Sequence, residues 1–557
     1  MQVLLAFDEG MHLLKEKNVQ TSKKKSLSYK GKKFDPQTVL LAGILALTFF
    51  LYSGALRNEI LIGWDDGEYL TNPVITNPGQ GAGSAIFSEY HLGMYQPLAV
   101  LSFLFNYKLA GDNAAGYILI NILLHLFNTW LVYKLMMLWL KRFEAAFLVT
   151  LLFVIHPMHV EGVVWISTRS SLLYSAFFLA GLIQYEKYLA NRSAKNYSLT
   201  LILALLALFS KSMAATFPLI LFLIDYIESR KFTGKVIAEK IPFLILSVIF
   251  GILAIKASAS FGHITILEDQ YNLFERMVLI LYGISFYMVK LVLPMNLSAI
   301  YAFPNTINGD FPGWVFTPMI ALAVYAIIIL RARENRRLYI FGGLFFLSSI
   351  SMVLPLFWSR IFITADRYSY IPYIGLIIII AMGLVKIFDQ LKYCQRSTRN
   401  MIYAAAGLIL LFLVGGVSER IKAWHDVPSL MTDVLEKQRS DADMAHAYFY
   451  LGNYHDVRSE DDEALKNYDL AISRNKKYLL AYNNRAILLG KHGNLNEAIQ
   501  DLTKAINLKP DYAEAWYNRG VAYYQMQQNE KACHDWRRAA ELGFKEANIV
   551  MGRYCRN

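Results

Sequence analysis

Cysteine is scarce in this chain of 557 residues, which holds only Cys394, Cys533 and Cys555. Their spacing matches neither a metal-binding motif nor a disulfide framework, so neither is expected. The N-terminal segment also lacks a short apolar core followed by a small-residue cleavage site, which argues against a secretory signal peptide. Charged residues make up 18% of the chain and hydrophobic residues 55%. The apolar runs approach ~20 residues, the length that crosses a hydrocarbon core, and so indicate a polytopic membrane protein.

Positive charge is unevenly distributed and orients the predicted spans. The lysine-rich segment 1–36 favours a cytoplasmic N-terminus, and basic clusters at 230–240, 331–337 and 386–399 are predicted to be cytoplasmic as well. The net charge of +12 is largely explained by these inward-facing loops, so nucleic acid is not an expected partner.

The orientation rule predicts an all-α bundle of about eleven spans, with the C-terminus outside. Counting 276–293 as a crossing would put the 331–337 cluster outside, so 276–293 is predicted to be an interfacial or re-entrant helix, and 94–110 likewise. The expected spans are 38–57, 113–139, 144–157, 169–189, 197–210, 213–228, 240–257, 314–331, 338–356, 369–388 and 401–418. The predicted plan is a cytoplasmic segment 1–36, a transmembrane domain 37–420, a linker 421–441 and a soluble domain 442–557.

The soluble domain contains a repeat. Tyr448, Tyr482 and Trp516 are spaced by 34 residues, and alanines at 464, 498 and 532 follow the same period. This period, with small residues where helices cross, is typical of tetratricopeptide repeats, and three of them predict a short α-solenoid on the outer side. Its concave face is a peptide-binding surface, with acceptor contacts expected at Tyr482, Asn484, Asn518 and Arg519.

Asp65 and Asp66 stand side by side in the first outer loop, at the membrane surface. Adjacent carboxylates repel each other, and a need for a general base or a cation ligand would explain the pair. A turn is the alternative, because Asp and Gly are common turn residues.

Three basic residues, Arg169, Lys211 and Arg367, also map to the outer face. Together they suit a lipid-linked phosphate, although each one alone could be snorkelling at the interface. A carboxylate pair facing them could deprotonate an incoming hydroxyl, which would then attack an anomeric carbon with the lipid phosphate as leaving group.

A second polar motif contains His156, His159 and Glu161, whose spacing could contact a divalent metal. Pro157 interrupts simple helical geometry, so a hydrogen-bonded cluster that shapes the site is favoured over a metal centre. A divalent metal is therefore the one cofactor left open.

Several motifs in order along the chain resemble the transmembrane and tetratricopeptide-repeat-containing protein O-mannosyltransferases, of the GT-C glycosyltransferase superfamily. They are Trp64-Asp65-Asp66, Tyr95-Gln96-Pro97-Leu98, Asn121-Ile122-Leu123-Leu124-His125, the stretch 156–167, Ser210-Lys211-Ser212-Met213-Ala214 and the stretch 366–372. The resemblance covers nearly the whole chain, repeats included.

The resemblance implies a membrane enzyme that moves a sugar, typically mannose, from a polyprenyl or dolichyl monophosphate carrier. The acceptor would be a Ser or Thr hydroxyl of an exported protein in the lumen or periplasm. An acidic residue of the first outer loop is then the expected base, here Asp66 with Asp65 as its partner. Carrier-phosphate binding carries over onto Arg169, Lys211 and Arg367 with Tyr368, and His125 joins the residues that shape the site.

The chain departs from this family's pattern in three places. Ser170 and Ser171 follow Arg169, where relatives often have an acidic residue, while Asp366 stands for a glutamate and Gln96 for an arginine.

Two alternatives stay open: a GT-C transferase acting on a lipid or glycan, and a non-enzymatic membrane scaffold that works through its repeats. A transporter is disfavoured because the polar groups gather at one face. A bacterial inner membrane and an endoplasmic reticulum fit equally well.

Overall fold

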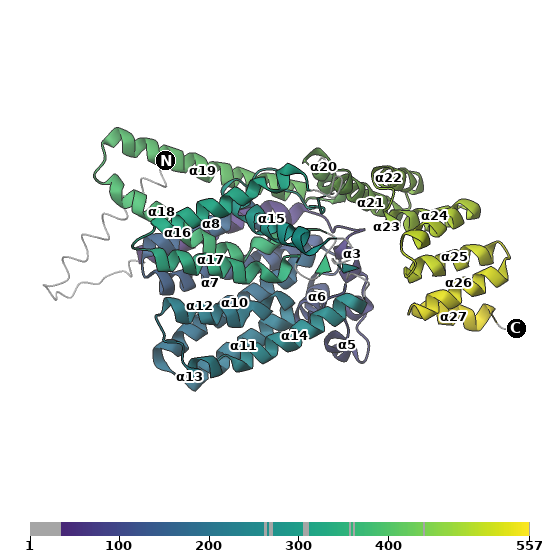
Figure 1. Cartoon of the computed structure of the whole chain (residues 1–557), viewed down its shortest axis with the longest axis horizontal. Coiled ribbons are helices and arrows are strands. Elements are labelled where there is room, and N and C mark those ends of the chain that lie inside the picture. Colours follow the sequence, from purple (N-terminus) through teal and green to yellow (C-terminus); the bar gives the residue numbers. More distant parts are fainter. Residues whose placement is uncertain are drawn as a thin grey trace. The chain divides into compact units, whose positions relative to one another are not determined.

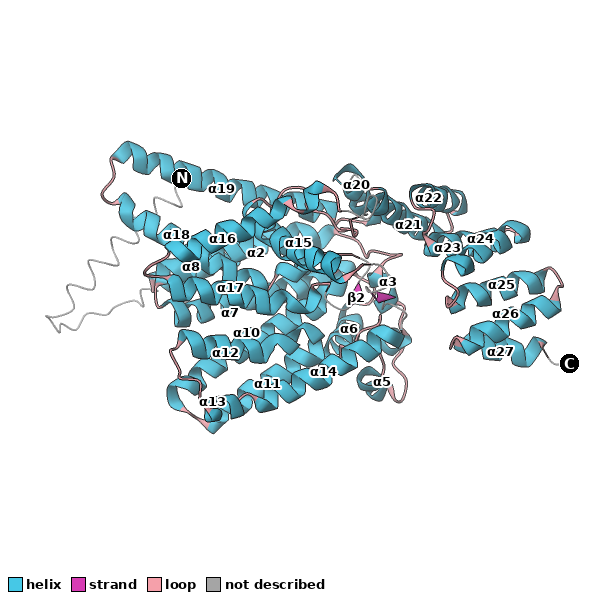
Figure 2. Cartoon of the chain, in the orientation of Figure 1, coloured by secondary structure: helices cyan, strands magenta, loops and turns pink. Residues whose placement is uncertain are grey.

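The computed structural model describes residues 35–260, 265–266, 271–304, 311–355, 358–359, 362–437 and 440–555, and these are almost entirely helical (Figures 1 and 2). The chain divides into two compact units. The first contains residues 1–59, 69–297 and 304–425, and the second contains 60–68, 298–303 and 426–557. The lysine-rich segment lies outside the described residues, apart from its last two positions.

The first unit is a helical bundle that corresponds to the predicted transmembrane domain. Its longer helices are α2 (Pro36–Tyr52), α6 (Pro97–Ala110), α7 (Ala114–Leu140), α8 (Phe143–Ile155), α10 (Arg169–Asn191), α11 (Ala194–Ser210), α12 (Phe217–Ile227), α14 (Ile241–Ser260), α15 (Leu273–Val292), α16 (Ile320–Arg331), α17 (Arg336–Ile350), α18 (Pro372–Leu391) and α19 (Arg396–Ala423). Its short elements are η1 (Ser53–Arg57), α4 (Pro73–Thr76), α5 (Ala82–Ser88), η2 (Pro157–His159), α9 (Val160–Val164), η3 (Ile166–Thr168), η4 (Ser212–Thr216), α13 (Gly234–Ala238), η6 (Gly313–Val315), η7 (Thr317–Met319), η8 (Ser351–Val353) and η9 (Asp366–Ser369). Strands β1 (Thr265–Ile266) and β2 (Trp358–Ser359) pair antiparallel.

Seven helices within the described ranges are long and apolar enough to cross a membrane, and an eighth is added if a bent helix pair counts as one span. That pair, α8 followed by Pro157–Val164, bends by 59° at the break. Three shorter apolar helices are Pro97–Ala110, Ala194–Ser210 and Ser212–Ile227. Every predicted span coincides with a helix, but length and composition support seven or eight crossings, so the number eleven stays a prediction.

Burial separates the centre of the bundle from its outer helices. In the most apolar window of Ile166–Asn191, 72% of residues are buried within the protein, against 6% for Gly313–Arg331 and 11% for Arg396–Ala423. Large apolar side chains such as Leu330 and Leu411 are 71% and 69% exposed. Apolar surface of this extent needs a non-aqueous environment. The exposed helices therefore indicate a multi-pass membrane protein.

Buried charges join α10, α12 and the start of α14 at one end of the bundle. The Asp225 carboxylate, fully buried, forms ion pairs with Lys240 and with Arg230, the latter at 2.8 Å. The Tyr185 hydroxyl donates to Asp225 at 2.8 Å and accepts from the Lys240 ammonium at 2.6 Å, and Arg230 also pairs with Glu239 at 3.0 Å. Two cations of the 230–240 cluster are therefore neutralised inside the protein.

We expect Asp225→Asn to destabilise the bundle strongly, because it removes the buried carboxylate that Lys240 and Arg230 share and leaves the Lys240 ammonium only a longer pair, at 3.7 Å, with Glu239. A broken buried pair costs about 3–5 kcal/mol, which lowers the thermal midpoint of the detergent-solubilised chain by more than about 5 °C. The matched control is Asp389→Asn, whose partner Arg142 lies 2.7 Å away in a pair that is 42% and 36% exposed. Exposed pairs contribute about 0–1 kcal/mol, so equal shifts in the two variants would contradict the prediction.

The second unit contains the repeats. Its helices are α20 (Val427–Lys437), α21 (Asp441–Val457), α22 (Asp461–Arg474), α23 (Leu479–Lys491), α24 (Leu495–Leu508), α25 (Ala513–Gln525), α26 (Asn529–Glu541) and α27 (Lys545–Tyr554). The predicted linker 421–441 is itself mostly helical, because it contains α20 and the end of α19. Three helix pairs follow, as the 34-residue period predicts, and a final single helix, α27, comes after them (Figure 1).

Small residues set the distance between the two helices of a repeat. A Cβ atom at Gly452 would lie 2.5 Å from the Tyr468 ring, and one at Gly520 would lie 2.6 Å from the Trp536 ring. The middle repeat has Ala486 at the same position. In the first and third repeats, a glycine on the first helix thus leaves space that an aromatic side chain of the second helix fills.

A disulfide joins Cys533 of α26 to Cys555, one residue beyond α27, with the Cα atoms 5.7 Å apart. The expectation that the cysteines form no disulfide is therefore wrong for two of them. The spacing of 22 residues has no motif character, and only the folding of α27 back onto α26 brings the two thiols together.

Removing this disulfide is expected to loosen α27. Closing a loop of this size contributes about 3 kcal/mol through the unfolded state. The variant Cys533→Ser/Cys555→Ser should lose hydrogen-exchange protection across α27, while Cys394→Ser, at the exposed free cysteine, should not. Unchanged protection of α27 in the double variant would refute this.

Candidate functional site

The structure distinguishes the two neighbouring aspartates. Both lie in the first turn of α3 (Asp65–Leu70), where carboxylates interact favourably with the exposed backbone N–H groups. Asp66 is 1% exposed, and its carboxylate accepts the Leu61 backbone N–H at 3.2 Å, whereas Asp65 is half-buried. Asp66 is thus fixed in orientation by its own loop, and Asp65 is the more accessible of the two.

The loop 60–68 belongs to the repeat unit and packs on its helix α21. The Trp64 indole stacks on the Tyr450 ring with centroids 4.8 Å apart and planes 14° from parallel. Gly63 has φ +84°, and a Cβ atom there would lie 3.0 Å from the Tyr454 backbone nitrogen and 3.1 Å from the Asn453 carbonyl carbon. Only glycine combines this backbone conformation with so close an approach.

A second short stretch, 298–303, also belongs to the repeat unit. The Ala302 backbone N–H donates to the Asp443 carboxylate of α21 at 2.7 Å. Burial raises the pKa of Asp443, while hydrogen bonds from Ser440 and Ala302 oppose the rise. Helix α21 therefore holds two loops that are far from it in sequence.

In the first unit, Glu161 of α9 and Arg367 of η9 are brought together across 206 residues of sequence. The Arg367 backbone N–H donates to the Glu161 carboxylate at 2.9 Å, and the guanidinium forms an ion pair with the same group. The guanidinium carbon also lies 5.0 Å from the Trp165 ring centroid and 4.9 Å from that of Tyr368. Glu161 is 1% exposed, while the Arg367 side chain is 17% exposed.

Arg169 is placed differently from Arg367. It is fully buried, and its guanidinium donates to Asn121 at 2.9 Å, to Asn106 at 2.7 Å and to the Tyr117 carbonyl at 2.6 Å. These bonds join the start of α10 to α6 and α7. The geometry gives Arg169 a structural task, and its burial does not suit the predicted phosphate contact.

Two of the departures from the family pattern, Ser171 and Gln96, form hydrogen bonds within the bundle. The Lys211 ammonium donates to the Ser171 hydroxyl at 2.6 Å, so the serine that stands near the expected acidic position faces this cation. The Gln96 amide donates to the Tyr69 hydroxyl in a very short contact.

The histidines form a connected aromatic and hydrogen-bonded cluster. His156 Nε2 bonds the Leu291 carbonyl at 3.0 Å, His159 Nδ1 the Phe153 carbonyl at 2.7 Å, and His125 Nδ1 the Tyr370 hydroxyl at 2.7 Å. Within the described residues, no group of three or more His, Cys, Asp or Glu side chains could hold a metal ion. These contacts suit the predicted site-shaping role.

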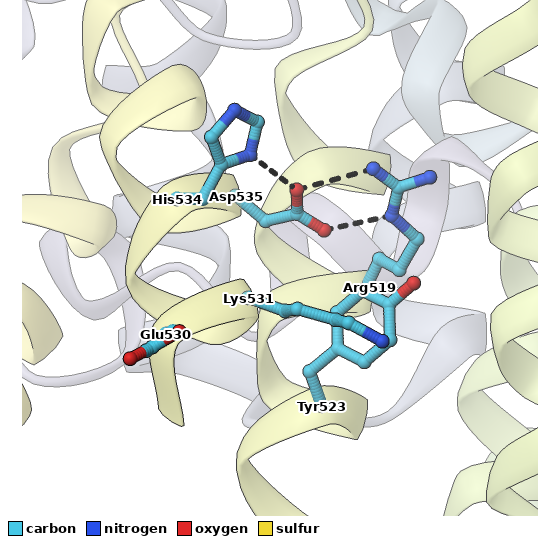
Figure 3. A pocket seen from close by; sticks show the side chains of 6 residues that line it. All are labelled: Arg519, Tyr523, Glu530, Lys531, His534 and Asp535. Atoms are coloured by element: carbon cyan, nitrogen blue, oxygen red, sulfur yellow. Dashed lines mark hydrogen bonds and ion pairs between the residues drawn. The ribbon is translucent and has the colours of Figure 1, made fainter. Parts of the chain in front are cut away.

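The predicted acceptor contacts occupy the repeat unit in different ways. Tyr482 is 8% exposed and packs in the solenoid core, while Asn484 donates to Asn453 at 2.9 Å and Asn518 to Asn483 at 3.0 Å. Arg519 pairs with Asp535 through two nitrogens, at 2.7 and 3.1 Å. Figure 3 shows this pair at a pocket of about 300 Å³. Its lining residues, most of which the sequence did not suggest, are Arg519, Tyr523, Glu530, Lys531, His534 and Asp535.

The family-model comparison concerns the repeats. Models described as "TPR repeat" and "Tetratricopeptide repeat" match residues 491–527 and 513–543. The predicted tetratricopeptide repeat is confirmed.

The curated relatives extend over the membrane bundle. Protein O-mannosyl-transferase F38B6.6 of Caenorhabditis elegans is 26% identical over 455 residues, which are 78% of this chain and 62% of that protein. Human protein O-mannosyl-transferase TMTC3 is 23% identical over 560 residues, 84% of this chain and 59% of that protein. Drosophila melanogaster Tmtc1 reaches 32% over 197 residues, 34% and 23% of the two chains. The resemblance to protein O-mannosyl-transferases is confirmed over most of the chain. The chain spans less than two thirds of the length of each of these relatives.

Solved structures match a smaller share. The Arabidopsis OM64 TPR domain is 25% identical, covers 20% of this chain and 96% of that domain, and has a TM-score of 0.20. The first TPR domain of RPAP3, bound to an HSP90 peptide, is also 25% identical and covers 20% and 92%, with a TM-score of 0.20.

Proposed function

We propose that this chain is a GT-C glycosyltransferase that moves a sugar, mannose in the first instance, from a polyprenyl or dolichyl monophosphate to Ser or Thr hydroxyls of exported proteins. The observation that carries the proposal is the similarity, over 78% and 84% of the chain, to proteins named protein O-mannosyl-transferases. The arrangement of charged groups in each unit supports it.

The proposed reaction inverts the anomeric carbon. Asp66 takes the proton of the acceptor hydroxyl, the hydroxyl oxygen attacks the anomeric carbon, and the bond from that carbon to the phosphate oxygen breaks. Asp65 orients the acceptor beside the base. Arg367 and Tyr368, with Lys211, bind the carrier phosphate and offset the charge that grows on it as it leaves. Arg169, which is fully buried, supports them by joining α10 to α6 and α7. The products are the glycosylated Ser or Thr side chain and the lipid monophosphate, and the proton of the acceptor hydroxyl resides on the Asp66 carboxyl group.

The proposed orientation has the N-terminus in the cytoplasm and the aspartate loop with the repeats in the lumen or periplasm. Two independent observations support it. Basic residues gather in the 331–337 and 386–399 loops, as expected for cytoplasmic segments. The Cys533–Cys555 disulfide lies in the repeat unit, and disulfides persist in oxidising compartments.

The repeat unit is proposed to bind the acceptor polypeptide. Its surface offers the amides of Asn484 and Asn518, which can recognise a peptide backbone, and a mixed-charge pocket beside Arg519. A helical solenoid suits an extended polypeptide better than a lipid or a free glycan.

Mass spectrometry of exported proteins from cells with and without the chain tests the function. We expect hexose-modified Ser and Thr residues that depend on the chain and are lost with the Asp66→Asn variant. An unchanged set of glycopeptides would refute the transferase proposal. Hexose transfer found on lipids or glycans alone would identify a different acceptor class.

A further inference from the structure

The loop that carries Asp65 and Asp66 has its structural support in the first repeat of the solenoid. By their contacts, residues 60–68 belong to the same compact unit as the repeats. Trp64, directly before the aspartates, stacks flat on Tyr450 of α21. The repeat domain therefore packs on a loop that comes far before it in the sequence.

A second contact fixes the same loop from the other side of Trp64. The Gly63 Cα lies against the α21 backbone so closely that a Cβ atom would meet the Tyr454 nitrogen at 3.0 Å. Because Gly63 also has a positive φ of +84°, any other residue there is strained and displaced from α21. Gly63 and Trp64 together form a two-point attachment one residue from Asp65.

The attachment site is connected to the predicted acceptor surface. Asn453, whose backbone lies against Gly63, accepts hydrogen bonds through its side-chain oxygen from the Asn484 amide at 2.9 Å and from the Tyr468 hydroxyl at 3.0 Å. Asn484 is one of the residues expected to contact the acceptor. A single helix, α21, thus links a candidate acceptor amide and the aspartate loop through adjacent contacts.

We propose that Tyr450 and Asn453 are positioning residues for the transfer reaction: the first tetratricopeptide repeat holds the Asp65–Asp66 loop in its active conformation. The proposal rests on the proposed function, since it assigns the loop a catalytic task. It makes the repeat unit part of the active site, so that even an acceptor too small to bind the solenoid needs α21 in place. A stacked aromatic pair is a suitable device, because it fixes both distance and ring orientation.

Tyr450→Ala in the full-length chain is the central test. With a saturating lipid-linked sugar and a short serine-containing peptide as acceptor, we expect kcat to fall about tenfold and KM for the peptide to change less than about twofold. Hydrogen exchange across residues 60–68 should become faster. Tyr450→Phe retains the stacked ring and should restore both readouts, whereas Gly63→Ala should reproduce both defects by unseating the loop from its other side.

The matched control is Tyr448→Ala, two residues away on the same helix. Tyr448 packs against the solenoid core, as Tyr450 does, but the ring stacked on Trp64 is that of Tyr450, so loss of the Tyr448 ring loosens the repeat without removing the stacked pair. We expect wild-type kcat on the short peptide and unchanged exchange across 60–68. A Tyr450→Ala enzyme with wild-type kcat and wild-type protection of the loop overturns the proposal, as does an equal loss of kcat in Tyr448→Ala.

The two readouts separate this inference from the proposed function. If the wild-type chain transfers no sugar, the proposed function fails, and hydrogen exchange alone decides whether α21 holds the loop. If the wild-type chain transfers sugar and both Asp65→Asn and Asp66→Asn keep full activity, the loop has no catalytic task. Tyr450 then has no positioning role in the reaction, even if hydrogen exchange of residues 60–68 is faster in Tyr450→Ala.

Discussion

Asp66→Asn is expected to lower the rate of sugar transfer to protein by about 100-fold to 10,000-fold, the range that a positioned general base contributes. The amide retains the size of the carboxylate and can still accept the Leu61 N–H bond, but it cannot take a proton. The loop should therefore keep its structure while the reaction stops. The measurement is single-turnover transfer from a lipid-linked mannose to a serine peptide by the purified chain.

Asp65→Asn should have a smaller effect, about tenfold, because an orienting group contributes less than the group that accepts the proton. Glu68→Gln is the matched control, since Glu68 is an exposed acid in the same short helix and should be neutral. Hydrogen exchange of residues 60–68 in each variant excludes a folding defect. Full activity in both aspartate variants would remove the base from this loop.

Most of the fold could be predicted from the periodic spacing of apolar and small residues. The apolar runs became helices, and the 34-residue spacing became three helix pairs with alanines buried at the crossings. The pattern reports which residues face a neighbour but not how long a helix must be to cross a bilayer. The helix α17 has only 15 residues where a span of 338–356 was expected.

Periodic patterns do not predict which residues far apart in the sequence form ion pairs, hydrogen bonds or a disulfide with each other. Glu161 and Arg367 were each singled out, yet nothing in their spacing showed that they form one ion pair. The buried state of Arg169 depends on amides from α6 and α7, and periodicity does not specify such polar pairings. The Cys533–Cys555 disulfide was missed for the same reason.

One overlooked signal did lie in the sequence. Gly63 and Trp64 directly precede the two aspartates. A glycine beside a large aromatic residue on a polar loop is a recognisable mark of close backbone approach with a ring anchored nearby. The partner, Tyr450, occupies the position one 34-residue period before Asn484, where the first repeat has an aromatic ring in place of an amide. The first repeat therefore departs from the others at the residue that contacts the loop.

The second prediction with a large effect concerns Arg367. Replacing it with Gln should raise KM for the lipid-linked donor by about 10-fold to 100-fold, since a charge-assisted hydrogen bond contributes about 1.5–3 kcal/mol. The same change also leaves the buried Glu161 carboxylate without its cation, so a loss of stability could imitate a loss of donor binding. Donor KM and thermal unfolding of the full-length chain must therefore be measured together.

The double variant Glu161→Gln/Arg367→Gln separates the two effects. It removes the unpaired charge, so the thermal midpoint should return to within a few degrees of wild type, because replacing both members of a buried pair costs far less than removing one. If Arg367 contacts the carrier phosphate, the raised donor KM persists in this stable variant. If Arg367 only neutralises Glu161, the double variant recovers the wild-type donor KM, and the phosphate must be bound elsewhere. Because the guanidinium carbon lies 5.0 Å from the Trp165 ring centroid and 4.9 Å from that of Tyr368, Arg367→Lys should recover only part of the affinity, as an ammonium neither stacks nor binds phosphate in a bidentate manner.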